Sequence, residues 1–189
     1  MAQQPRNFSI SLAKMPAPQW SALAPIKVGA SEGNLSNPQD FVLVSEGDAP
    51  FLRIAVYNPH DDYHLRCEAD IWRDWVLVGF GRQVAIVPLA GGDVCGFSLS
   101  DPALDTLFDY FCRFYCDADH AFASSGRRVF RIGEDGSLMW TSPEVGLDGV
   151  LVHDVSAGLV TGDGEWDPPG GWLPFTLALD TGVLLCGER

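Results

Sequence analysis

Short apolar runs, separated by turns that contain Gly, Asp and Asn, follow one another along the chain from about Ile26 onward. Closely spaced runs bounded by such residues are typical of the strands of an all-β domain. Residues 102–107, with Asp101 as their N-cap, could hold one helical turn. No other stretch has the apolar period of a helix of normal length. The pattern therefore predicts an all-β fold.

Four turns that combine acidic residues with glycine divide this pattern into units. Their glycines, Gly47, Gly92, Gly136 and Gly182, are spaced 45, 44 and 46 residues apart. Each turn joins two strand-like runs, which are 41–44 and 51–56, 84–87 and 94–99, 129–132 and 138–140, and 175–179 and 183–186. A near-constant interval of this kind predicts four repeated units of ~45 residues.

Two further strand-like runs precede the turn in each of the later three units. The first runs are 64–72, 109–116 and 149–155, and the second runs are 75–79, 120–124 and 158–161. Four short antiparallel strands in ~45 residues match the size of a β-propeller blade. We therefore predict a propeller-like arrangement of four units. Because four blades are few for a closed ring, a twisted β-meander or sandwich is the alternative.

One of these units also carries a recognisable order of residues. In 129–140 a strand, an Asp-Gly turn and the run Leu-Met-Trp follow one another, and this order resembles the repeats of quinoprotein-type β-propellers. The turn Asp180-Thr181-Gly182, with an apolar run after it, resembles them too. The resemblance implies a propeller-like fold.

The beginning of the chain differs in composition from the remainder. Residues 1–25 are rich in Pro, Ala and Gln, and we expect them to form an irregular N-terminal extension. Four large apolar residues are expected to pack part of it onto the domain: Phe8, Ile10, Leu12 and Trp20. Residues 26–189 are predicted to form a single repeat-built β domain.

Charge limits the partners that this domain can have. The chain has 25 acidic residues against 12 Lys and Arg, for a formal net charge of -13. Such a surface repels phosphate backbones, so we expect no nucleic-acid ligand. It can steer a basic protein, or it can simply be a solvated surface. With no apolar run of signal-peptide length at the start and none of membrane-spanning length anywhere, a cytoplasmic location is expected.

The five cysteines do not suggest a disulfide framework. Cys112 and Cys116 lie in one strand-like run, where four residues of extended chain separate their Cα atoms by ~13 Å. A disulfide tolerates no more than about 7 Å, so these two cannot pair with each other. Without a Cys-x-x-Cys pair for zinc, we expect buried free thiols.

The stretch 162–172, Gly-Asp-Gly-Glu-Trp-Asp-Pro-Pro-Gly-Gly-Trp, is the most unusual in composition. It is predicted to be a long loop inserted in the fourth unit. Its acids and tryptophans are the candidate ligand- or partner-binding residues: Asp163, Glu165, Trp166, Asp167 and Trp172. Tryptophans beside carboxylates suit an interface anchor or the stacking of a sugar. The alternative is a purely structural role, in which the tryptophans cover the end of the core. Alternating carboxylates also suit Ca²⁺, but the EF-hand pattern is absent.

Other polar clusters carry less chemistry. His60-Asp-Asp-Tyr-His64 could bind a transition metal, yet Pro59 and the flanking runs favour a polar hairpin tip. Asp117-Ala-Asp-His120 is predicted to be a turn whose acids accept local backbone N–H groups. There is no Gly-x-Ser-x-Gly elbow, phosphate loop or His-Glu-x-x-His. We therefore assign no catalytic residue, metal site or cofactor.

Residues 129–182, which include Gly-Glu-Trp-Asp-Pro-Pro-Gly-Gly-Trp, resemble stretches of uncharacterised bacterial proteins. Some small acidic proteins of this kind serve as immunity partners of polymorphic toxins. The favoured hypothesis is thus a non-enzymatic protein–protein binding module, in its most specific form an immunity protein that binds a basic toxin. The alternatives are a carbohydrate or small-ligand binding protein or hydrolase that uses the carboxylates of 162–172, and one part of a larger β assembly.

Overall fold

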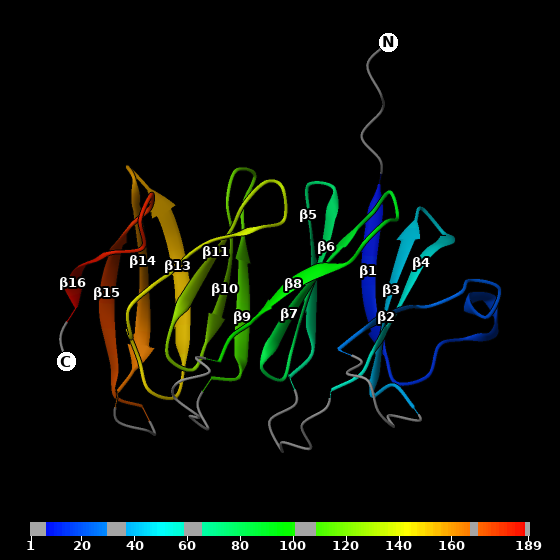
Figure 1. Ribbon diagram of the computed structural model, residues 1–189, viewed down its shortest axis with the longest axis horizontal. Coiled ribbons are helices and arrows are strands. Elements are labelled where there is room, and N and C mark those ends of the chain that lie inside the picture. Colours follow the sequence, from blue (N-terminus) through cyan, green and yellow to red (C-terminus); the bar gives the residue numbers. More distant parts are fainter. Residues whose placement is uncertain (1–6, 30–36, 59–65, 101–108, 167–169, 188–189) are drawn as a thin grey trace, which may run out of the picture.

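The chain forms four separate four-stranded sheets that follow one another in sequence order (Figure 1). The computed structural model describes residues 7–29, 37–58, 66–100, 109–166 and 170–187. The sheets stand in a row, with the first and the last at opposite ends, and do not close into a ring. Within the described ranges the helical content is one 3-10 turn, η1 (Pro18–Trp20), and no helix could cross a membrane. The prediction of an all-β, propeller-like fold of four units is confirmed.

Each sheet is built from strands that are close in sequence. The first sheet has the order β1 (Phe8–Ala13), β3 (Asp40–Glu46), β4 (Ala49–Val56) and β2 (Ile26–Val28). The second contains β5 (Glu68–Trp72), β6 (Trp75–Phe80), β7 (Gln83–Pro88) and β8 (Cys95–Ser98). The third contains β9 (Phe111–Cys116), β10 (Ala121–Ser125), β11 (Val129–Ile132) and β12 (Leu138–Thr141). The fourth contains β13 (Val150–Ser156), β14 (Leu159–Glu165), β15 (Trp172–Ala178) and β16 (Leu184–Gly187).

The first sheet departs from the repeat. Strand β2 pairs with β4 in parallel, whereas all other neighbouring strands are antiparallel. The turn at Gly47 joins β3 to β4 in the middle of its sheet, while those at Gly92, Gly136 and Gly182 each join the last two strands of theirs. The first of the three intervals therefore connects two turns that are not structurally equivalent.

The expectation of an irregular extension over 1–25 is corrected from Phe8 onward. Phe8 and Ile10 alternate with serines, which is the period of a strand with one buried face, and β1 pairs antiparallel with β3. Leu12 is 45% exposed. Trp20 is buried in η1, which lies beside β4. The N-terminal segment thus completes and covers the first sheet, and the domain begins before residue 26.

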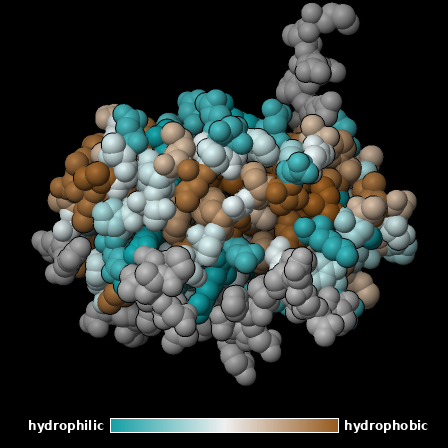
Figure 2. All heavy atoms as spheres, in the orientation of Figure 1, coloured by the Kyte–Doolittle hydropathy of each residue, from teal (hydrophilic) through white to brown (hydrophobic). Residues whose placement is uncertain are grey.

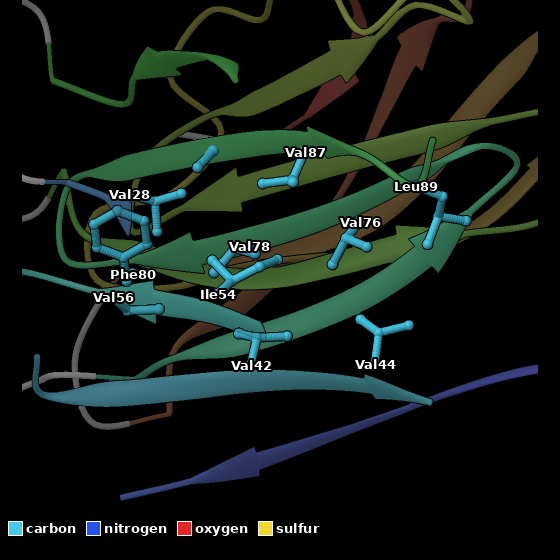
Figure 3. Packing of buried hydrophobic residues seen from close by; sticks show 11 residues of the cluster. Val28, Val42, Val44, Ile54, Val56, Val76, Val78, Phe80, Val87 and Leu89 are labelled. Carbon is cyan, nitrogen blue, oxygen red and sulfur yellow. The ribbon is translucent and has the colours of Figure 1, made fainter. Parts of the chain in front are cut away.

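The core consists of three apolar layers, one between each pair of adjacent sheets. The layer between the first and second sheets contains Val42, Ile54, Val78 and Phe80 (Figure 3). The two central sheets are covered on both faces, so β6 reads as an almost continuous apolar run. The first strands of the four units, β1, β5, β9 and β13, are neighbours along the row.

Close packing between units explains two of the periodic glycines. Gly182 has a φ of 68°, and a Cβ at this position would lie 2.5 Å from Cε3 of Trp140 in the preceding sheet. The Trp140 Nε1–H donates a 2.9 Å hydrogen bond to the backbone O of Leu179. Gly136, with a φ of 78°, lies less tightly against the second sheet, where a Cβ would be 3.4 Å from Cη2 of Trp75, and the Trp75 Nε1–H donates a 2.9 Å hydrogen bond to the backbone O of Glu134. The turn of one unit therefore docks on an indole of the unit before it.

The predicted loop 162–172 is shorter than expected, because β14 extends through Glu165 and β15 begins at Trp172. Gly162 and Gly164 are strand residues rather than turn residues. A Cβ at Gly162 would meet the backbone O of Leu151, and one at Gly164 would meet the backbone O of Val145. Both glycines thus allow a neighbouring backbone segment of the same domain to approach closely. The remaining connection, 166–171, is still longer than its counterparts 81–82 and 126–128.

The cysteines are free thiols, as predicted. The expectation that they are buried is wrong for Cys95 and Cys186, which are exposed on the last strands of their sheets. Apolar side chains also reach the surface at the end of the molecule formed by the fourth sheet (Figure 2). The last strand of a sheet has one neighbour only, so it buries less of each side chain.

Candidate functional site

A groove of about 690 Å³ lies between the first strands of the third and fourth sheets. It is larger than a second pocket of about 350 Å³ between the first and second sheets. Six side chains that could meet a ligand line this groove: Arg66, Tyr110, Cys112, Arg113, Asp148 and Trp172. They come from the segments that enter β5, β9, β13 and β15, so three of the four units contribute to one site.

Tyr110 and Asp148 are joined by a hydrogen bond in the lining of the groove. The Tyr110 hydroxyl lies 2.6 Å from Oδ1 and 2.7 Å from the backbone O of Asp148, and these two acceptors share its proton. Burial raises the pKa of Tyr110 far above its usual value, and the hydrogen bond to the Asp148 carboxylate raises it further. The phenol therefore stays protonated and acts as a hydrogen-bond donor at neutral pH.

Cys112 follows Tyr110 by two residues and is half-buried in the same wall. Burial raises the pKa of its thiol to about 11, and a backbone hydrogen bond from Val150 only partly opposes this effect. Since the thiolate is the nucleophilic form, a thiol with this pKa is unreactive at neutral pH. The groove thus holds its O–H and S–H groups in their neutral states.

Two arginines form the wall nearest the second sheet. The Nε atoms of Arg66 and Arg113 lie 3.5 and 3.9 Å from the same oxygen, Oε2 of Glu68. The other carboxylate oxygen of Glu68 accepts a 3.3 Å hydrogen bond from the backbone N–H of Phe114. Glu68 therefore holds both guanidinium groups beside the third sheet, and about half of each arginine side chain is exposed.

Trp172, the first residue of β15, also lines the groove, and it is 40% exposed. Its register partner across the β14–β15 hairpin is Glu165. A Cβ at Gly149 would lie 2.9 Å from Cη2 of Trp172 and 3.6 Å from Oε2 of Glu165, so the ring rests directly on the Gly149 backbone. Glu165 itself accepts a 2.6 Å hydrogen bond from the backbone N–H of Gly170 through Oε1. Glu165 thus closes the hairpin beside the ring.

The predicted binding residues therefore separate into two places. Trp172 lines the groove and Glu165 lies next to it. Asp163 lies on the face of the fourth sheet, where its Oδ2 is 2.8 Å from Nε2 of His153. Trp166 is half-buried in the connection after β14 and does not line the groove. Asp167 lies outside the described residues.

Of the other predicted features, the structure tests only the turn at 117–120. The Asp117-to-His120 turn is confirmed: Oδ1 of Asp117 accepts 2.8 Å hydrogen bonds from the backbone N–H groups of Asp119 and His120. The His60–His64 cluster and the helical turn at 102–107 lie outside the described residues. Among the residues that are described, no group of three or more His, Cys, Asp or Glu could hold a metal ion.

Five of the six groove residues escaped the sequence analysis. Tyr110, Cys112 and Arg113 lie at the start of a predicted strand, and Asp148 lies just before another. Their only local signal is a set of polar residues at the entry to strands, which is common in β proteins. The adjacency of β9 and β13 brings them together, and that adjacency follows from the stacking of the units.

The comparisons with known proteins add no assignment. The chain matches no family model, and no curated protein matches it. Its function is therefore inferred from the groove itself.

Proposed function

We propose that the protein is a non-enzymatic protein-binding module and that the groove receives its partner. The observation that carries this proposal is the meeting of Trp172, Tyr110 and two arginines in one cavity. Trp, Tyr and Arg are the residue types most enriched at the energetic centres of protein interfaces. An aromatic wall supplies apolar contact area, while guanidinium and hydroxyl groups supply directed hydrogen bonds.

The neutral states of Tyr110 and Cys112 favour binding over chemistry. A catalytic acid, base or nucleophile has its pKa tuned towards the working pH, whereas both of these pKa values are raised away from it. The described lining also presents one carboxylate, Asp148, which Tyr110 engages. A hydrolase that uses the paired acids of 162–172 has no support from this arrangement, since Asp163 is bonded to His153 and Glu165 to Gly170.

The partner that suits this surface is a basic protein. A net charge of -13 speeds association with a basic partner and repels nucleic acid. In its most specific form, the proposal is an immunity protein of a bacterial cytoplasm that neutralises a basic toxin by covering it. Charge would then govern the rate of encounter, and the groove would govern how long the complex lasts.

Capture experiments with a matched pair of variants test this function. The wild type, W172A and M139A are immobilised and exposed to lysate of the native host, and retained proteins are identified and their affinities measured after purification. Met139 is 54% exposed on β12 and does not line the groove, which makes it the control. We expect a partner retained by the wild type and M139A, with affinity reduced at least tenfold in W172A. Equal retention by W172A, or retention of nothing by the wild type, would contradict the proposal.

A further inference from the structure

The guanidinium groups of Arg66 and Arg113, which form the arginine wall of the groove, have N–H donors that Glu68 does not engage. Each of Arg66 and Arg113 contacts Glu68 through Nε at a long distance. Within the described ranges, no other hydrogen bond or ion pair engages either guanidinium group. A guanidinium carries five N–H donors, and most of those in this wall have no partner among the described residues.

The charge of this wall is opposite to that of the protein as a whole. Glu68 neutralises one of the two guanidinium charges, which leaves the three residues with one net positive charge in a chain whose total is -13. Because both Nε atoms contact the same carboxylate oxygen, the two guanidinium groups are immediate neighbours. Adjacent planar forks of this kind match the two oxygens of a carboxylate.

We propose that Arg66 and Arg113 bind a carboxylate carried by the partner polypeptide. This inference rests on the proposed function and names the chemical group that the groove recognises. The acidic surface repels a free anion, so the carboxylate must arrive on a chain whose other residues are basic. The neighbouring residues of that chain then lie against Tyr110 and Trp172 across the groove.

A set of three peptides tests the inference, because the site and the bulk charge make opposite predictions. All three are acetylated lysine–alanine peptides: one has a central glutamate and an amidated end, one has glutamine there and an amidated end, and one has glutamine and a free carboxyl end. Attraction to an acidic surface alone favours the amidated glutamine peptide, which is the most positive. The arginine site instead favours a peptide with a carboxylate, and the last peptide distinguishes a chain end from a side chain.

We expect at least one carboxylate-bearing peptide to bind the wild type on the order of five-fold to ten-fold more tightly than the amidated glutamine peptide, as a charge-assisted pair does. The preference should reverse in the R66Q/R113Q double variant and in R113Q alone, should weaken in R113K, and should persist in K27Q. Lys27 is an exposed cation on β2 outside the groove, so K27Q controls for net charge. Circular dichroism spectra establish that each variant is folded.

The inference is overturned if the amidated glutamine peptide binds the wild type as tightly as the others, or if none of the three binds. It is also overturned if the preference survives in the double variant. These outcomes are separable from failure of the proposed function, which depends on Trp172. A partner that needs Trp172 but tolerates R66Q/R113Q leaves the protein-binding function standing and removes the carboxylate site.

Discussion

The hydroxyl of Tyr110 donates to the carboxylate of Asp148 at 2.6 Å, and this contact links the third sheet to the segment that enters the fourth. The two residues are 38 positions apart in the chain. Both residues line the groove, together with Arg113 and Trp172. It therefore belongs both to the stability of the stack and to the shape of the proposed binding site.

Removing the hydroxyl should lower the stability of the fold. In Y110F the Asp148 carboxylate loses its donor, and we expect the free energy of unfolding to fall by about 1–2 kcal/mol. Urea denaturation followed by circular dichroism measures this change. In D148N the side-chain oxygen can still accept, so this variant should lose less than Y110F. Equal stability of Y110F and the wild type would show that the hydrogen bond contributes nothing net.

The raised pKa of Tyr110 predicts a loss of stability in alkali. A pKa that is higher in the folded state than in the unfolded chain contributes stability that is fully present below the unfolded value of about 10 and is lost as pH rises above it. Cys112, with a pKa of about 11 when folded, adds to the loss in the same direction. Denaturant midpoints measured from neutral pH to above pH 10 should fall more steeply for the wild type than for Y110F. Parallel curves would contradict the burial of this phenol.

Contact between units predicts a large effect at one turn glycine. In G182A the new methyl group meets both a positive φ of 68° and the Trp140 ring at 2.5 Å. We expect a loss of about 2–4 kcal/mol, from backbone strain of about 1–2 kcal/mol and overpacking of a similar size. The matched control is G158A, where φ is 77° but nothing lies within 4 Å of the new Cβ. Equal losses in the two variants would show that the docking of the turn on Trp140 adds nothing.

The N-terminal segment should be an integral part of the domain. Trp20 is 6% exposed beside β4, and W20A should cost about 3–5 kcal/mol because it leaves a large cavity over the first sheet. Thermal unfolding measures the effect, with M15A as the control because Met15 is 84% exposed. A stable W20A protein would restore the view of residues 1–25 as a loose extension.

Local patterning was enough to predict most of the strands. Runs such as 84–87 and 129–132 are apolar, short and bounded by Gly and Asp, and each corresponds to an observed strand. The same pattern concealed β1, because the prolines and alanines around Phe8 and Ile10 outweighed their two-residue alternation. Gly162 and Gly164 had the opposite effect, because they favoured a loop where the structure has a strand. A glycine that allows a neighbouring backbone to approach cannot be distinguished in the sequence from a glycine that forms a turn.

The groove could not be predicted in the same way. Trp172 was a candidate because it is an aromatic residue in an unusual context, but its partners in the groove are distant in sequence. The positions of Tyr110, Arg113 and Asp148 depend on which strands are neighbours, and no local pattern encodes that relationship. The composition of 162–172 thus identified one residue of the site and missed the residues that the second and third units contribute.

Photocrosslinking in the native cell tests the central claim most directly. A photoreactive phenylalanine analogue is placed at position 151, which lines the groove together with Trp172, and, in a second strain, at position 139 on β12. After irradiation, we expect a discrete covalent adduct with one basic protein from position 151 and none from position 139. An adduct from position 139 but not from position 151, or no adduct from either position, would contradict a partner in the groove.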